Sequence, residues 1–277
     1  MHLSIFGCHI HIDGTHRPAL ALAETNYRAF LSPPSRDTPD LLYRVDGEDP
    51  NQPSGLSLTR RGTRHDLAWA GLDAAEFLYV LEKDLTIELQ RRRPQYYFLH
   101  AAALSRGDAA FLLVARSGGG KSTTCWGLLQ EGCSYLSDEL APVDLDRLEV
   151  QPYPHALCLK SDPPGPAPLP QDTLRTNYTL HVPARALASA PVDIPVPLRA
   201  IFFVEYAGRP SEPSITPLPA AEASMLLYAN ALNPLSHPAD GLDGSVTIAT
   251  GIPAFRVSTG ALQASAAAII AAVDRCR

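Results

Sequence analysis

A glycine-rich segment in the middle of the chain holds the residue types that bind phosphate groups. It reads Ala115-Arg-Ser-Gly-Gly-Gly-Lys-Ser-Thr123 and follows the apolar stretch from Ala109 to Val114. Glycines let the backbone approach a ligand closely, and the unpaired N–H groups at a helix N-terminus attract anions. A lysine there reaches the β- and γ-phosphates, and the next hydroxyl binds Mg²⁺. The segment therefore predicts a site for the phosphates of a nucleoside triphosphate, ATP before others.

The predicted nucleotide ligands share one short run of the chain. They are Ser117, Gly118, Gly119, Gly120, Lys121, Ser122 and Thr123. The pattern GxxxxGK[ST] has glycine six positions before the lysine, where this chain has Ala115. The alternative, a glycine-rich turn without a ligand, is the weaker interpretation because the loop lies between a predicted strand and a predicted helix.

Phosphoryl transfer also needs a carboxylate near the metal and a group that accepts the proton of the attacking hydroxyl. Asp138 and Glu139 follow a short predicted strand just after the helix of the loop, where they would face the phosphates. An exposed acidic turn is the alternative. His100 lies in an apolar run that precedes the loop strand, and a lone histidine there is more often a core residue.

The stretch from His100 to Glu139 resembles the catalytic domain of bacterial HPr kinase/phosphorylase. It is more similar still to shorter HPr-kinase-related proteins, some of which accompany the biosynthesis of ribosomally made, modified peptides. His100 precedes Lys121 by 21 positions and Asp138 follows Lys121 by 17, as in that family. The resemblance implies a PEP-carboxykinase-like nucleotide-binding domain, with Asp138 helping to deprotonate the acceptor and Ser122 and Glu139 at the magnesium. It also places His100 at the border of the reaction centre.

Two positions depart from the family pattern. Glu139 stands where the family usually has aspartate, and Thr123 stands where HPr kinases have glutamate. The glycine-rich signature that engages HPr is also missing, so the resemblance favours a kinase without HPr as its substrate. We expect transfer of the γ-phosphate of ATP, with Mg²⁺, to a Ser or Thr hydroxyl of a peptide or protein such as a ribosomally made precursor peptide. A small-molecule kinase, another nucleotide-dependent transferase and a non-catalytic NTP-binding regulator remain open, as do another phosphate donor and a homo-oligomer.

The elements that must position these residues follow from hydrophobic periodicity and from Gly and Pro. We expect an α/β fold: a small N-terminal α+β region over 1–94, β-rich up to about residue 70, and an ATP-binding catalytic domain over 95–277, with a mixed sheet and helices packed on it. A Pro-rich loop near 161–170 interrupts the second domain. Lys160 or Arg175 beside it could reach the γ-phosphate or the acceptor, although surface positions are the favoured interpretation for both. The predicted strands are 2–13, 97–104, 109–114, 134–137, 200–205 and 254–258, and the predicted helices are 74–90, 121–130, 220–230 and 262–273.

Composition excludes several classes of partner. The 277 residues include 23 Lys and Arg against 29 Asp and Glu, a net charge of −6, so we expect neither nucleic acid nor an anionic membrane as a partner. The five cysteines are widely spaced and form no CxxC pair, which argues against a disulfide framework and a zinc site. The chain shows no signal-peptide pattern and no run of roughly 18–20 apolar residues, so we expect a cytoplasmic protein.

Overall fold

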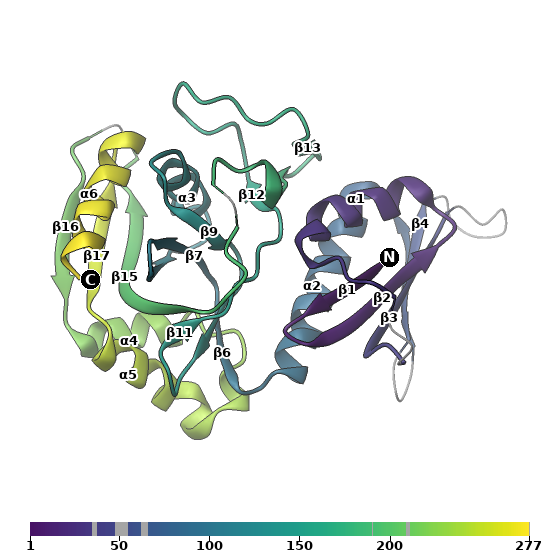
Figure 1. Cartoon of the computed structure of the whole chain (residues 1–277), viewed down its shortest axis with the longest axis horizontal. Coiled ribbons are helices and arrows are strands. Elements are labelled where there is room, and N and C mark those ends of the chain that lie inside the picture. Colours follow the sequence, from purple (N-terminus) through teal and green to yellow (C-terminus); the bar gives the residue numbers. More distant parts are fainter. Residues whose placement is uncertain (35–37, 48–54, 62–65, 190, 209–210, 277) are drawn as a thin grey trace.

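The computed structural model describes residues 1–277 except 35–37, 48–54, 62–65, 190, 209–210 and 277. The protein is a mixed α/β protein with three sheets, and the first 92 residues lie beside the remainder (Figure 1). The α-helices of the described residues are Arg17–Tyr27 (α1), Ala74–Arg92 (α2), Lys121–Gln130 (α3), Ala220–Tyr228 (α4), Leu242–Gly251 (α5) and Leu262–Arg275 (α6). The strands are His2–Ile5 (β1), Cys8–Gly14 (β2), Leu41–Asp46 (β3), Leu56–Arg61 (β4), Leu67–Leu72 (β5), Tyr96–Leu99 (β6), Ala101–Arg106 (β7), Ala109–Val114 (β8), Ser134–Ser137 (β9), Ala141–Asp144 (β10), Glu149–Val150 (β11), Leu157–Leu159 (β12), Leu174–Arg175 (β13), Leu180–Val182 (β14), Val196–Tyr206 (β15), Ser214–Leu218 (β16) and Ala254–Thr259 (β17).

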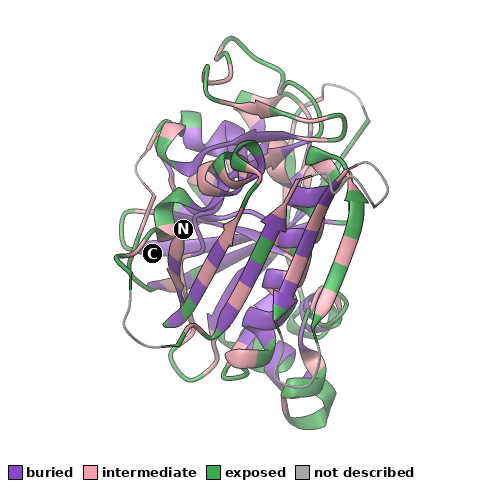
Figure 2. Cartoon of the chain, turned by 90° about the vertical axis from the view of Figure 1, so that its right-hand side faces the viewer, coloured by how far each residue is buried: buried purple, intermediate pink, exposed green. Residues whose placement is uncertain are grey.

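The N-terminal part is a five-stranded sheet in the order β1-β2-β3-β4-β5, with a core shared with α1 and α2. Buried residues alternate with more exposed ones along β2, β3 and β4, as expected for a sheet covered on one face (Figure 2). Helix α2 begins with a capping box, because Asp73 accepts from the backbone of Glu76 and the Glu76 side chain accepts from the backbone of Asp73. This cap fixes the start of the predicted helix at 74, and the helix continues two residues past its predicted end at 90.

The large sheet carries helices on both faces. Its path is β6-β10-β11-β15-β8-β7-β9, with β17 and β16 joined through β15. Phe111 and Leu113 of β8 pack into the core that holds α3 and α6, whereas Leu112 and Val114 pack into the core that holds α4 and α5. Burial on both faces explains why the sequence of β8 is apolar throughout. A third sheet, β12-β14-β13, lies against the α3 side.

Helix α3 packs closely on α6 through a glycine. A Cβ atom on Gly127 would lie 2.6 Å from Cδ1 of Leu262, which is closer than packed carbon atoms approach. This contact fixes the position of α3, which begins at the glycine-rich loop, relative to α6. The predicted elements 109–114, 121–130 and 134–137 match β8, α3 and β9 residue for residue.

Two predicted strands are wrong because each is interrupted. The strand predicted over 2–13 is the hairpin β1–β2, which turns at Phe6 and Gly7 with φ values of 50° and 73°. The strand predicted over 97–104 breaks at His100 into β6, which pairs with β10, and β7, which pairs with β8 and β9. An apolar run does not show where a chain leaves one strand partner for another.

Helices α1 and α5 were not predicted. Helix α1 lies in the stretch expected to be β-rich, and it buries Ala19, Ala23, Asn26 and Tyr27 on one face. Alanine and asparagine give a weak hydrophobic period, so that face carries little signal in the sequence.

Candidate functional site

The glycine-rich loop joins the end of β8 to the start of α3. Gly118 and Gly120 have φ values of 80° and 96°, a region that residues with a side chain rarely adopt. Gly120 is the N-cap of α3 and has no side chain that could accept from the N–H groups of the first turn. Lys121 is the first residue of the helix and Ser122 and Thr123 follow it. The N-terminus of α3 therefore offers uncapped donors to an anion.

The order of three strands brings the acids and His100 to this loop. Strand β7 lies between β8 and β9 and runs antiparallel to both, so β8 and β9 run in the same direction. The carboxyl ends of β8 and β9 and the start of β7 therefore meet at one edge of the sheet. Ala101 pairs with Val114 and Ala103 pairs with Ser137, which places His100 next to the loop and Asp138 beside both.

Five side chains form a continuous hydrogen-bonded network, called here the phosphate-loop site. Nζ of Lys121 donates to Oδ1 of Asp138 at 2.6 Å and to Oε1 of Glu139 at 2.9 Å. The Ser122 hydroxyl donates to Oδ2 of Asp138 at 2.7 Å. Nε2 of His100 donates to Oε2 of Glu139 at 2.9 Å. The predicted residues thus come together, with His100 paired to Glu139 rather than to Asp138.

The two acids of the site differ in exposure. The side chain of Asp138 is 0% exposed, whereas that of Glu139 is 46% exposed. Burial acts to raise the pKa of Glu139, but the hydrogen bond from His100 and the charge of Lys121 outweigh it and lower the pKa to about 2. Burial alone would lower the pKa of Lys121, but the charges of Asp138 and Glu139 raise it above its ordinary value. Glu139 and Lys121 are therefore held in their charged forms.

Lys160 also reaches the loop. Lys160 follows the end of β12, and its Nζ donates to the hydroxyl of Ser117 at a distance of 3.2 Å. Lys160 is exposed, which agrees with the surface position that the sequence favoured. No motif links it to the loop, because the contact spans 43 residues. Arg175 instead pairs with Asp162 at 2.9 Å on the surface. The residues 161–170 predicted as a Pro-rich loop contain no helix or strand and start directly after Lys160.

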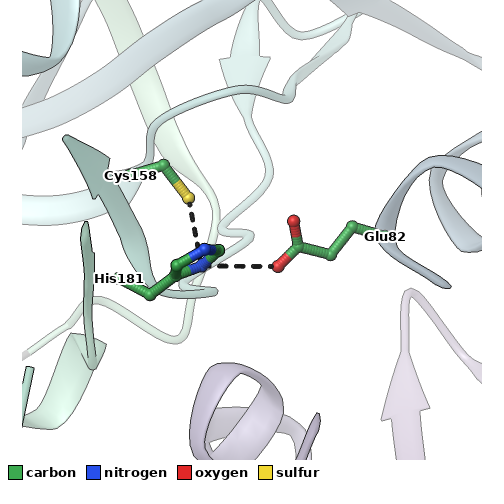
Figure 3. A group of neighbouring side chains, drawn as sticks. All are labelled: Glu82, Cys158 and His181. Carbon is green, nitrogen blue, oxygen red and sulfur yellow. Dashed lines mark hydrogen bonds and ion pairs between the residues drawn. The ribbon is translucent and has the colours of Figure 1, made fainter. Parts of the chain in front are cut away.

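A second group of polar side chains, called here the Cys158 cluster, was not predicted. It consists of Glu82 on α2, Cys158 on β12 and His181 on β14 (Figure 3). Asn26 on α1 joins it through hydrogen bonds to Glu82 and His181. Burial raises the pKa of Glu82 to about 7 and lowers that of His181 to about 4. The four residues lie far apart in the sequence, so no spacing pattern could have revealed them.

Comparisons with known proteins assign no family to the chain. Neither a scan against protein-family models nor a search of curated proteins finds a match. Among the residues described here, no helix combines the length and the hydropathy that crossing a bilayer requires.

Proposed function

We propose that this protein is a kinase that binds ATP and Mg²⁺ at the phosphate-loop site and transfers the γ-phosphate to a Ser or Thr hydroxyl of a peptide or protein. The observation that carries the proposal is the position of Lys121. It begins α3 directly after the glycine-rich loop and contacts both acids. A lysine, a hydroxyl, two carboxylates and a histidine at one helix N-terminus are the groups that phosphoryl transfer uses.

The fold is consistent with the PEP-carboxykinase-like domain that the sequence resembles. Strand β8, which leads into the loop, has a parallel neighbour in β15 and an antiparallel neighbour in β7. The sheet that carries the loop is therefore mixed. This agreement supports the domain assignment within 95–277, and the separate N-terminal domain over 1–94 is part of the same proposal.

The hydrogen bonds favour one division of work between the acids. Ser122 bonds to Asp138, and a loop hydroxyl with a buried aspartate is the pair that holds Mg²⁺ in phosphate-loop enzymes. Glu139 is more exposed and bonds to His100, so an incoming hydroxyl can reach it. We therefore propose Asp138 for the metal and Glu139 with His100 for the proton, the reverse of the assignment that the resemblance implies. Mg²⁺, when bound, supplies neutralisation of the charge that develops on the phosphates.

The positions of these side chains indicate how the γ-phosphate would be transferred. ATP phosphates attract Lys121 away from the two carboxylates, and the uncapped N–H groups of α3 hold the phosphate oxygens. With Lys121 turned to the phosphates, the pKa of Glu139 loses one of the influences that lower it, which makes its carboxylate a better proton acceptor. The acceptor oxygen gives its proton to Glu139 and bonds to the γ-phosphorus as the bond to the β–γ bridging oxygen breaks. The products are the phosphorylated acceptor and ADP.

Mass spectrometry of candidate peptides after incubation with ATP and Mg²⁺ tests the proposal. We expect a gain of one phosphate on a Ser or Thr, absent from a parallel reaction with the Lys121→Ala variant. Phosphorylation of a small molecule but of no peptide would favour the alternative that the protein is a small-molecule kinase. ATP binding by calorimetry without any transfer would favour a non-catalytic regulator, and no ATP binding would reject the proposal.

A further inference from the structure

The side chains of the Cys158 cluster offer sulfur, nitrogen and oxygen ligands to a common centre. The sulfur of Cys158, a ring nitrogen of His181 and a carboxylate oxygen of Glu82 all lie within 4.8 Å of one another. The three side chains converge from β12, β14 and α2 (Figure 3). We propose that they bind a zinc ion that ties the N-terminal part of the chain to the β12–β14 pair.

The distances are close to those of a zinc site. A tetrahedral zinc with a Zn–S bond of about 2.3 Å and a Zn–N bond of about 2.0 Å keeps sulfur and nitrogen about 3.5 Å apart. Sγ of Cys158 lies 3.6 Å from Nδ1 of His181. Oε1 of Glu82 lies 3.8 Å from the same nitrogen, where a zinc site needs about 3.3 Å. Closure by about half an ångström, within the reach of a glutamate side chain, would bring Glu82 to the distance from His181 that a zinc site needs.

The lone pair of His181 that would bind zinc accepts a hydrogen bond from Asn26 in this structure, and zinc would replace that donor. The Asn26 amide donates to Nδ1 at 3.0 Å, which makes Nδ1 the acceptor of the ring. Nε2 then carries the proton and donates to the Thr179 hydroxyl at 2.8 Å. Metal-binding histidines are oriented in this way, with one nitrogen on the metal and the other donating to a neighbouring oxygen.

The cluster has a carboxylate but no cation of its own. Within the described part of the chain, no Lys or Arg forms an ion pair with Glu82, whose bonding partners are Asn26 and His181. A thiol, an imidazole and a carboxylate together form a ligand set that suits Zn²⁺. As the Zn–S bond forms, the Cys158 thiol releases its proton to water.

A second observation comes from Asn26, which is 2% exposed. Its Oδ1 is buried and has no hydrogen-bond partner among the described residues, although its Nδ2 donates to Glu82 at 2.6 Å. Buried amide oxygens without a donor are rare. Three protein ligands leave a fourth zinc position for water, and such a water has protons for Oδ1 to accept.

A zinc ion at Cys158 would also restrict the movement of Lys160, which contacts the glycine-rich loop. Cys158 lies two positions before Lys160, which donates to Ser117 of the glycine-rich loop. The zinc proposal does not depend on kinase activity, because its tests measure metal binding and melting.

The first experiment measures metal binding directly. The purified chain, treated with chelator and then titrated with Co²⁺ in excess Mg²⁺, should show the near-ultraviolet charge-transfer band of a thiolate–Co²⁺ bond, and Zn²⁺ should displace it. The band should vanish in Cys158→Ser and His181→Asn and persist in Cys133→Ser, which alters a buried cysteine outside the cluster. No band in the parent, or a band that survives Cys158→Ser, overturns the proposal.

The second experiment changes Asn26 to Asp and keeps all three ligands. The new carboxylate beside Glu82 should lower the melting temperature of the metal-free protein, because like charges repel in a buried place. The same charge should tighten zinc binding, so that added zinc raises the melting temperature more in the variant than in the parent. A variant that melts lower with no additional response to zinc would mean that the cluster is only a hydrogen-bonded contact.

Discussion

The phosphate-loop site and the Cys158 cluster balance charge in different ways, although β12 connects the cluster to the glycine-rich loop through the contact of Lys160 with Ser117. Strand β12 carries Cys158, and Lys160 follows its end. In the phosphate-loop site, Lys121 lies between two carboxylates and offsets one of their two negative charges without a ligand. In the Cys158 cluster, Glu82 accepts a hydrogen bond from Asn26 and lies 3.8 Å from His181, and none of its ion pairs among the described residues is with a Lys or Arg. ATP, in the proposed function, would therefore compete with the carboxylates for Lys121, whereas the proposed zinc ion would supply the cation that the Cys158 cluster lacks.

The same difference determines what each site contributes to folding. Removing one partner of a buried ion pair leaves the other charge buried and uncompensated, which costs more than the pair itself contributes. Asp138 is in that position because its side chain is fully buried. Changes at the phosphate-loop site therefore affect stability and binding together, and experiments must separate the two.

Replacing Lys121 with Ala should have the largest effect. It removes the cation that we propose for the β- and γ-phosphates, so calorimetry should detect no ATP binding in the presence of Mg²⁺. It also leaves Asp138 without its cation, which should lower the free energy of unfolding by about 3–5 kcal/mol. Unchanged ATP affinity in this variant would reject the phosphate-binding role of the loop.

The double variant Lys121→Met, Asp138→Asn is the matched control. It removes both buried charges, so urea unfolding should show most of the lost stability restored. ATP binding should remain absent. A stable double variant that binds ATP would show that the single variant lost binding only because it was unfolded.

The Asp138→Asn and Glu139→Gln variants sharpen the division of roles. If Asp138 holds the metal, its variant should weaken the dependence of ATP binding on Mg²⁺. If Glu139 accepts the proton, its variant should bind ATP with parental affinity and lose turnover by a factor of about 10² to 10⁴. The reverse pair of results would restore the assignment drawn from the family resemblance. Titration of ATP at several Mg²⁺ concentrations, with turnover on the same preparations, distinguishes the two.

The contrast between the two sites also explains what the sequence could predict. The glycine-rich loop and Asp138 lie within a short stretch whose strands and helix were predicted with their bounds, so local spacing placed them correctly. The contact of Lys121 with both acids depends only on that stretch. The side-chain partner of His100 did not follow from spacing, because it depends on the break between β6 and β7.

The Cys158 cluster lies outside the reach of local patterns. It joins Asn26 to His181 across 155 residues, and α1, which carries Asn26, was itself not predicted. Long-range packing of the N-terminal helices against β12 and β14 creates the cluster. The absence of a CxxC pair, taken as evidence against a zinc site, tests only for ligands that are near one another in sequence.

Replacing His100 with Ala should have a smaller effect than the changes in the acids. The side chain is 31% exposed, so little core packing is lost, and the backbone N–H of His100 still donates to Asn230. Without its hydrogen bond, Glu139 is less firmly placed, and turnover should fall at least about tenfold in protein that still binds ATP. His100→Asn, which keeps a donor, should recover part of the loss. A lower melting temperature with parental turnover would make His100 a structural residue only.

The smallest expected effect concerns the charge balance of the phosphate-loop site without ligand. The folded pKa of Glu139, about 2, lies below the ordinary value of 4.5. A lowered carboxylate pKa gives stability that is fully present above about pH 4.5 and is lost as the pH falls towards 2. The stability difference between the parent and Glu139→Gln should therefore be constant near neutral pH and shrink between pH 4.5 and the lowest pH at which both fold. Because the side chain of Glu139 is 46% exposed, solvent screens this contribution and the change should be modest.

Urea unfolding from pH 3 to 7 measures this change in stability. The control is Glu131→Gln, at an exposed position just after α3. A stability difference that stays constant down to pH 3 would mean that Lys121 and His100 do not hold Glu139 in its charged form. The contacts of Glu139 with Lys121 and His100 would then be looser in solution than in this structure.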